Sequence, residues 1–116
     1  MLYPYRILSP GRPVVLVRLS GPFDLERSVS TLGALEFLPW EGEWRGLLWD
    51  VRKRTGYPDA AEVRELVGYF GRWNRTAIVA DRDVQYGMGR MASLLAEGVM
   101  AVRTLREGMR WATGEE

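Results

Sequence analysis

The stretch from Gly46 to Arg54 constrains the fold of this chain more than any other. It begins with an uninterrupted apolar run and ends with charged residues, in the order Gly-Leu-Leu-Trp-Asp-Val-Arg-Lys-Arg. A short apolar run bounded by turn residues is typical of a strand covered on both faces, as in a parallel sheet, although periodicity alone leaves a buried helix open. Open α/β sheets bind ligands beyond the carboxyl ends of their strands, so the charged end is the first place to look for function.

Strand-like and helix-like patterns alternate on both sides of this stretch. Strands are predicted at residues 5–8, 14–20, 46–54, 76–80 and 99–105, and helices at residues 25–38, 59–70, 83–98 and 105–112. Asp24 is expected to cap the first helix, and two pairs have the spacing of a capping box: Asp59 with Glu62, and Thr104 with Glu107. In the third helix, the residues predicted to face inward are Met88, Met91, Leu94 and Leu95.

These patterns predict an α/β fold in a single domain that spans residues 1–116. The element order is β-β-α-β-α-β-α-β-α, which implies right-handed crossovers and a mostly parallel five-stranded sheet with four helices packed on it. The turn at residues 9–13 is short and rich in proline and glycine, so it is expected to join the first two strands as a hairpin and to leave the first strand at an edge.

The composition excludes several classes of function. The chain has no cysteine and no histidine, which removes thiolate catalysis, the commonest general base and the commonest metal ligands. No cofactor, no metal site and no enzymatic activity are therefore predicted. Sixteen basic and 15 acidic residues give a net charge of +1, so nucleic acid is not an expected partner. No apolar run approaches the roughly 20 residues that span a bilayer, so no transmembrane segment is predicted and the expected location is cytoplasmic.

Three segments carry a resemblance to a known family. They read Leu-Leu-Trp-Asp-Val-Arg at residues 47–52, Ala-Ile-Val-Ala-Asp at residues 77–81 and Tyr-Gly-Met-Gly-Arg-Met at residues 86–91. Together with the element order, they resemble the SpoIIAA-like (STAS/SEC14-like) family within the STAS superfamily of anti-sigma-factor antagonists. The resemblance implies a small α/β domain, largely without enzymatic activity, of which some relatives hold small apolar or lipid ligands.

The best-understood members of that superfamily are regulators with a phosphorylated serine at the start of the helix after the central strand. The corresponding turn here, residues 54–58, reads Arg-Thr-Gly-Tyr-Pro and lacks the Asp-Ser-Ser/Thr-Gly motif. Thr55 is the one hydroxyl residue of this turn, so the phosphorylation switch is not carried over to this chain.

Charged residues at the ends of two predicted strands, together with two residues on the following helical turn, form the candidate site, which is expected to bind a ligand or partner. Its residues are Asp50, Arg52, Arg54, Asp81, Tyr86 and Arg90. If the strands are neighbours, these groups converge, and arginines near a helix N-terminus would attract an anion. The alternative is a structural ion-pair network in which Asp50 or Asp81 pairs with Arg90.

Other residues carry weaker signals. The four methionines at positions 88, 91, 100 and 109 are candidates either for an adaptable apolar pocket or for ordinary core packing. Gly87 and Gly89 are interpreted as sites of close packing rather than as a phosphate-binding turn. Trp40 and Trp44 are expected to fold back over the core, or else to form a partner surface.

The leading functional hypothesis is a non-enzymatic STAS-like binding or regulatory module. It would bind a protein partner or a small anionic ligand at the strand-tip rim that contains Asp50, Arg52 and Arg90. The alternative is a carrier of an apolar or lipid-like molecule in the domain interior. Binding of nucleic acid through residues 52–54 ranks below both, and an edge strand together with the loop tryptophans permits a homodimer.

Overall fold

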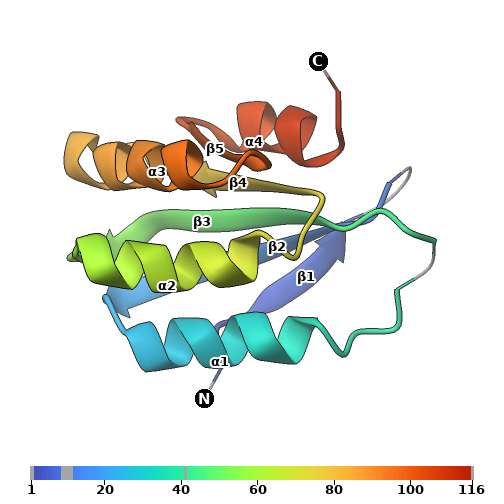
Figure 1. Ribbon diagram of the computed structural model, residues 1–116, viewed down its shortest axis with the longest axis horizontal. Coiled ribbons are helices and arrows are strands. Elements are labelled where there is room, and N and C mark those ends of the chain that lie inside the picture. Colours follow the sequence, from blue (N-terminus) through green and yellow to red (C-terminus); the bar gives the residue numbers. More distant parts are fainter. Residues whose placement is uncertain (1, 9–11, 41, 116) are drawn as a thin grey trace.

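Five strands form one sheet in the computed structural model, which describes residues 2–8, 12–40 and 42–115 (Figure 1). The strands are β1 (Tyr5–Leu8), β2 (Val14–Pro22), β3 (Gly46–Thr55), β4 (Arg75–Val79) and β5 (Val99–Val102). The helices are α1 (Leu25–Leu35), α2 (Ala60–Phe70), α3 (Asp83–Leu95) and α4 (Leu105–Ala112). The predicted element order is therefore confirmed. The predicted turn at residues 9–13 lies partly outside the described residues.

The strand order in the sheet is the order in the sequence, β1-β2-β3-β4-β5. β1 pairs with β2 antiparallel, and the pairs from β2 to β5 are parallel, so the sheet is mixed, with β1 at one edge. Because parallel crossovers are right-handed, helices that follow successive neighbouring strands fall on one face. Figure 1 shows α1, α2 and α3 running alongside one another, and their buried residues share one core. α4 packs on the other face, against Leu48 and Val79.

Short polar residues cap α1, α2 and α4 as expected, whereas the N-cap of α3 is Arg82, whose side chain makes no capping hydrogen bond. Asp24 accepts a hydrogen bond from the amide of Arg27 at 3.0 Å, and Asp59 and Glu62 form a complete capping box. At α4, the Thr104 hydroxyl oxygen accepts from the amide of Glu107 at 3.1 Å, and the hydroxyl itself donates to the Glu107 carboxylate. This pair supplies one half of a capping box, and it also explains why β5 ends at Val102 rather than at the predicted residue 105.

The inward face predicted for α3 is partly wrong. Leu94 is 85% exposed and Leu95 is 48% exposed. The buried positions are instead Gln85, Gly89 and Ala92, at steps of four and three residues. Glycine is favoured at position 89 because a Cβ atom there would lie 3.1 Å from the Cβ of Ala101. The apolar pattern is therefore displaced around the helix from the face that actually packs.

The end of α1 also differs from the prediction. The helix ends at Leu35 rather than near residue 38, and the next amides donate to carbonyls three residues earlier, as in Phe37 N to Ala34 O at 3.1 Å. Such bonds tighten the last turn of a helix. Within the described ranges, no helix is long and apolar enough to cross a membrane.

Candidate functional site

A β-bulge near the carboxyl end of β3 determines where its charged side chains point. Arg18 of β2 pairs with Asp50, but Ser20 pairs with Lys53, so β3 contains one extra residue between these two pairs. An extra residue reverses the alternation of side chains along a strand. Trp49 faces α2 and α3 before the bulge, and Arg54 faces the same side after it. Strict alternation would have placed Arg54 beside Asp50 and Arg52.

Asp50 and Arg52 form a bidentate ion pair on the opposite side of the strand. Arg52 Nε lies 2.9 Å from Asp50 Oδ1, and Arg52 Nη2 lies 2.9 Å from Asp50 Oδ2. The Arg52 amide also donates to Asp50 Oδ1 at 3.1 Å. The hydrogen bond that Arg52 donates to Asp50 raises the pKa of Arg52, and the negative charge of Asp81 adds to that effect. The two charges therefore satisfy each other largely without a ligand.

The remaining predicted site residues are dispersed around the start of α3. Tyr86 is half-buried, and the guanidinium carbon of Arg103 lies 4.0 Å from the centre of its ring. The same arginine donates to Asp83 and to the carbonyl of Asp81, at 3.1 and 3.2 Å. Arg90 is exposed, and the structure shows no ion pair between it and Asp50 or Asp81 among the described side chains. The predicted ion-pair alternative is wrong for Asp50, because its partner is Arg52.

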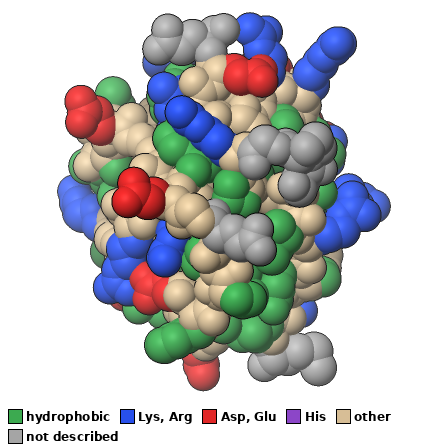
Figure 2. All heavy atoms as spheres, turned by 90° about the vertical axis from the view of Figure 1, so that its right-hand side faces the viewer, with side chains coloured by type: hydrophobic (Ala, Val, Ile, Leu, Met, Phe, Trp, Pro, Cys, Tyr) green, Lys and Arg blue, Asp and Glu red, His purple; other side chains and the backbone are tan. Residues whose placement is uncertain are grey.

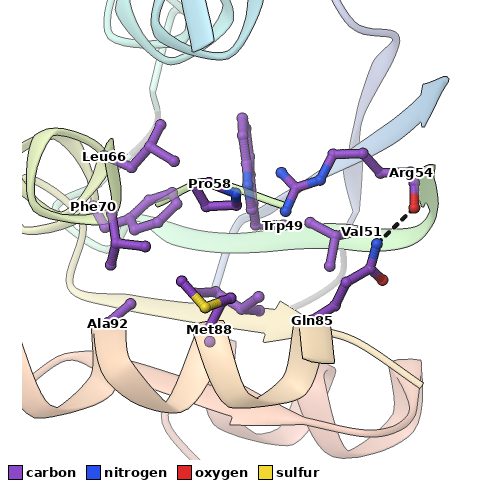
Figure 3. Close-up of a pocket in the computed structure, with 12 residues that line it drawn as sticks. Trp49, Val51, Arg54, Pro58, Leu66, Phe70, Gln85, Met88 and Ala92 are labelled. Carbon is purple, nitrogen blue, oxygen red and sulfur yellow. Dashed lines mark hydrogen bonds between the residues drawn. The ribbon is translucent and has the colours of Figure 1, made fainter. Parts of the chain in front are cut away.

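Arg54 lies in the interior, between the sheet and α2 and α3. Its exposure is 4%, and its Nε and Nη1 atoms are buried without a hydrogen-bond partner. The ring of Phe23 lies beside the guanidinium, with its centre 5.0 Å from the guanidinium carbon. Figure 3 shows the guanidinium reaching toward Trp49 and Pro58, into a pocket between the helices. Among the residues that the structure describes, Arg54 is therefore the buried charged side chain without an ion-pair partner.

The pocket around Arg54 is mostly apolar. Its lining comes from β3, β4, α2, α3 and the turn before α2: Trp49, Val51, Arg54, Pro58, Val63, Leu66, Phe70, Ile78, Gln85, Met88, Gly89 and Ala92. The cavity has a volume of about 20 Å³, which is room for about one water molecule. Burial in these surroundings lowers the pKa of Arg54 to about 10, the Tyr3 phenol acts to raise it, and Arg82 lowers it further. Arg54 therefore remains a cation at neutral pH.

Gln85 fixes the turn that carries Arg54. Its Nε2 atom donates to the carbonyl oxygens of Arg54 and Gly56, at 2.6 and 3.3 Å, and Arg82 also donates to the Arg54 carbonyl. Gly56 has a φ of 70°, a conformation that favours glycine. Gln85 Oε1 is buried without a partner, like the guanidinium nitrogens. Sequence reasoning missed Gln85, although it stands four residues before Gly89 on the buried face of α3.

The weaker candidates separate in the structure. Met88 lines the Arg54 pocket, whereas Met100 is 39% exposed. Met109 belongs to α4 and packs on the other face of the sheet, so the four methionines do not form one pocket. Close packing accounts for Gly89 but not for Gly87, where a Cβ atom would meet nothing within 4 Å.

The loop tryptophans fold back over the core, as expected. Trp40 packs edge-on against Trp73, with ring centres 5.3 Å apart. Trp44 Nε1 donates to the carbonyl of Ala112 at 2.9 Å. Both rings therefore serve the packing of the loop that precedes β3.

The site suits an anion better than a metal ion. Among the described residues, no three acidic side chains gather closely enough to hold a metal ion. The buried cation Arg54 and its neighbour Arg82 both repel a second cation. What the interior pocket offers is unpaired N–H donors with a positive charge, set in an apolar wall.

Comparison with known proteins shows the fold. No protein-family description matches the sequence, and a search of the curated proteins finds no match. Among solved structures, the chain is similar to an uncharacterised protein of the DUF3478 family with a SpoIIAA-like fold, from Shewanella loihica PV-4. The TM-score is 0.63 at 17% identity, over 94% of this chain and 92% of the other. The chain therefore has a SpoIIAA-like fold, as the sequence resemblance implied.

Proposed function

We propose that this protein of SpoIIAA-like fold is a non-enzymatic binding module, and that its ligand is a small anion held by Arg54 at the carboxyl end of β3. One observation carries the proposal: Arg54 is 96% buried, yet Nε and Nη1 have no acceptor. Removing one partner of a buried ion pair leaves the other charge unpaired, and this destabilises a folded protein by about 3 to 5 kcal/mol. An anion would supply the missing partner.

The chemistry around Arg54 supports binding rather than catalysis. Trp49, Pro58 and Phe23 lie around its guanidinium, and none of them serves as a nucleophile or as a general base. The chain as a whole has no histidine and no cysteine. The Asp50–Arg52 pair is already neutralised and adds little attraction for a ligand. Arg52, Asp81 and Arg90 remain a predicted surface for a protein partner.

A carrier of an apolar or lipid-like molecule is the second candidate. The apolar lining of the Arg54 pocket favours it, in particular Leu66, Phe70 and Met88. A cavity of about 20 Å³ does not hold a lipid chain, so α2 and α3 would have to move apart for such a ligand.

Anion binding by matched variants tests the proposal. We expect small anions such as chloride and acetate to raise the thermal midpoint of the wild-type protein, because a ligand that binds the folded state stabilises it. Arg54→Gln removes the charge and should abolish that rise. Arg45→Gln is the control, since Arg45 directly precedes the same strand at its other end, and it should respond like the wild type. Equal responses in all three proteins, or no response in any, would contradict the proposal.

A further inference from the structure

The Arg54 pocket has two chemically different parts. One part is a guanidinium whose Nε and Nη1 atoms lack acceptors. The other is a wall of aromatic and aliphatic side chains from β3, β4, α2 and α3, which includes Trp49, Phe70, Ile78 and Met88. A ligand that uses both parts must itself have a charged end and an apolar end. Figure 3 shows Leu66, Phe70 and Ala92 on the side of the pocket away from the Arg54 backbone.

The charge in the pocket matches a single negative charge. Arg54 is the one cation that lines it, because Arg82 is exposed and uses its side chain on the Arg54 carbonyl. A dianion such as phosphate would bring a second charge into apolar surroundings with no cation to meet it, and burying an unpaired charge is strongly unfavourable. A monoanion leaves the pocket neutral.

The shape of the guanidinium favours a carboxylate among the monoanions. A guanidinium presents pairs of parallel N–H groups that match the two oxygens of a carboxylate. The Nε and Nη1 atoms of Arg54 lie on different edges of the planar guanidinium, so each edge has an N–H donor without an acceptor.

The apolar part of such a ligand would be small. The cavity of about 20 Å³ admits a ligand of a few carbons only if a neighbouring side chain shifts, and Met88 is the adaptable one in the wall because it is unbranched. The closest packing is at Gly89, where the helix backbone approaches Ile78 and Ala101, so expansion on that side is not available.

We infer that the ligand is a small aliphatic monocarboxylate, with its carboxylate on Arg54 and its hydrocarbon part between α2 and α3 beside Met88. The inference rests on the proposed function and adds the ligand class. Two methylenes separate butyrate from acetate, and each methylene that is buried contributes roughly a fourfold increase in affinity. Butyrate is therefore expected to bind about 15-fold more tightly than acetate.

Titration of the wild-type protein with acetate, butyrate, 1-butanol and inorganic phosphate tests the ligand class. Binding is followed by calorimetry and by the NMR signal of the Arg54 Nε–H group, which is assigned by its loss in Arg54→Gln. We expect the order butyrate, then acetate, then phosphate and 1-butanol. Met88→Ala enlarges the pocket and should shift the preference from butyrate toward hexanoate, while Arg64→Ala, on the exposed side of α2, should leave it unchanged.

The outcomes separate the two proposals. Equal affinity for acetate and butyrate, or tighter binding of phosphate, would overturn the ligand class and leave anion binding by Arg54 standing. Binding of 1-butanol as tight as that of butyrate would overturn both in favour of an apolar carrier. If none of the four probes moves the Arg54 Nε–H signal, both proposals are wrong.

Discussion

The two ends of β3 differ in how the hydrogen-bonding groups around them are satisfied. At the amino end, polar groups find partners within the chain: the amide of Arg45 donates to Asn74 Oδ1 at 2.8 Å, and Trp44 Nε1 donates to the Ala112 carbonyl. The Arg45 guanidinium stacks on Trp40, 5.5 Å from the ring centre. Figure 2 shows this end of the molecule, where basic, acidic and apolar side chains are interspersed on the surface.

At the carboxyl end, Arg54 is more deeply buried than Arg45 and yet has unpaired nitrogens. The same residue type therefore stabilises one end of the strand and is costly at the other. Proteins tolerate such costs where binding requires them. This difference supports the proposal that a ligand completes the carboxyl end of β3, whereas the polar groups of the amino end already have partners within the fold.

The largest effect is expected from Gly46→Ala at the amino end. A Cβ atom there would collide with the backbone carbonyl of Ala112 and lie 2.9 Å from Val14 Cγ2. Backbone does not yield as a flexible side chain does, so we expect a loss of about 3 kcal/mol in the free energy of unfolding. Chemical denaturation measures it. A loss below about 1 kcal/mol would show that this end is less tightly packed than the comparison requires.

Arg54→Met is expected to act in the opposite direction. It replaces a buried unpaired charge with an apolar side chain of similar length, and the folded protein should gain about 2 kcal/mol while losing anion binding. The same change at Arg45 should bring no gain, because it removes a stacking contact worth about 0.5 to 1 kcal/mol. Chemical denaturation of the wild type, Arg54→Met and Arg45→Met at neutral pH measures the three free energies of unfolding. A destabilised Arg54→Met protein would break the contrast between the two ends.

The stability gap between Arg54→Met and the wild type should narrow at high pH. The folded pKa of Arg54 is lowered to about 10, well below the ordinary pKa that its guanidinium keeps in the unfolded chain. Between these values the folded state releases a proton that the unfolded state keeps, so wild-type stability relative to the variant rises with pH. We expect the gap to shrink by roughly 1 kcal/mol at about pH 10.5. A gap that stays constant from pH 7 to that value would mean that an unseen anion already pairs with Arg54.

The smallest effect is expected from Asn74→Ala at the amino end. The change removes the acceptor of the Arg45 amide and should cost about 1 kcal/mol of stability, the usual worth of one hydrogen bond. Affinity for acetate should not change, because Asn74 lies at the opposite end of the strand. Reduced affinity in a variant that is folded at the assay temperature would show that the two ends are coupled.

Much of the fold could be predicted from local patterns. The apolar run after Gly46 and the capping box at Asp59 identify a buried strand and the start of α2, because both signals depend only on neighbouring residues. The face of α3 could not be predicted in the same way. Leu94 and Leu95 look like core residues in the sequence, but the sheet is approached so closely at Gly89 that small residues occupy the true interface.

The candidate site was predicted less completely for a different reason. Asp50, Arg52 and Arg54 are spaced two residues apart, which in a regular strand puts all three on one face. The bulge is a feature of the pairing between β3 and β2, so the residues of β3 alone do not predict it. The prediction that Asp50 and Arg52 lie together therefore matches the geometry, whereas the interior position of Arg54 required the sheet register.

The bulge also has an evolutionary meaning. Deletion of one residue between Asp50 and Lys53 would restore regular alternation and turn the side chain of Arg54 outward. Relatives with the same tip residues in the same order would then differ in whether the interior holds a cation at all. A gain or loss of a single codon at this point would be enough to create or abolish the proposed binding site, without a substitution at any residue that lines it.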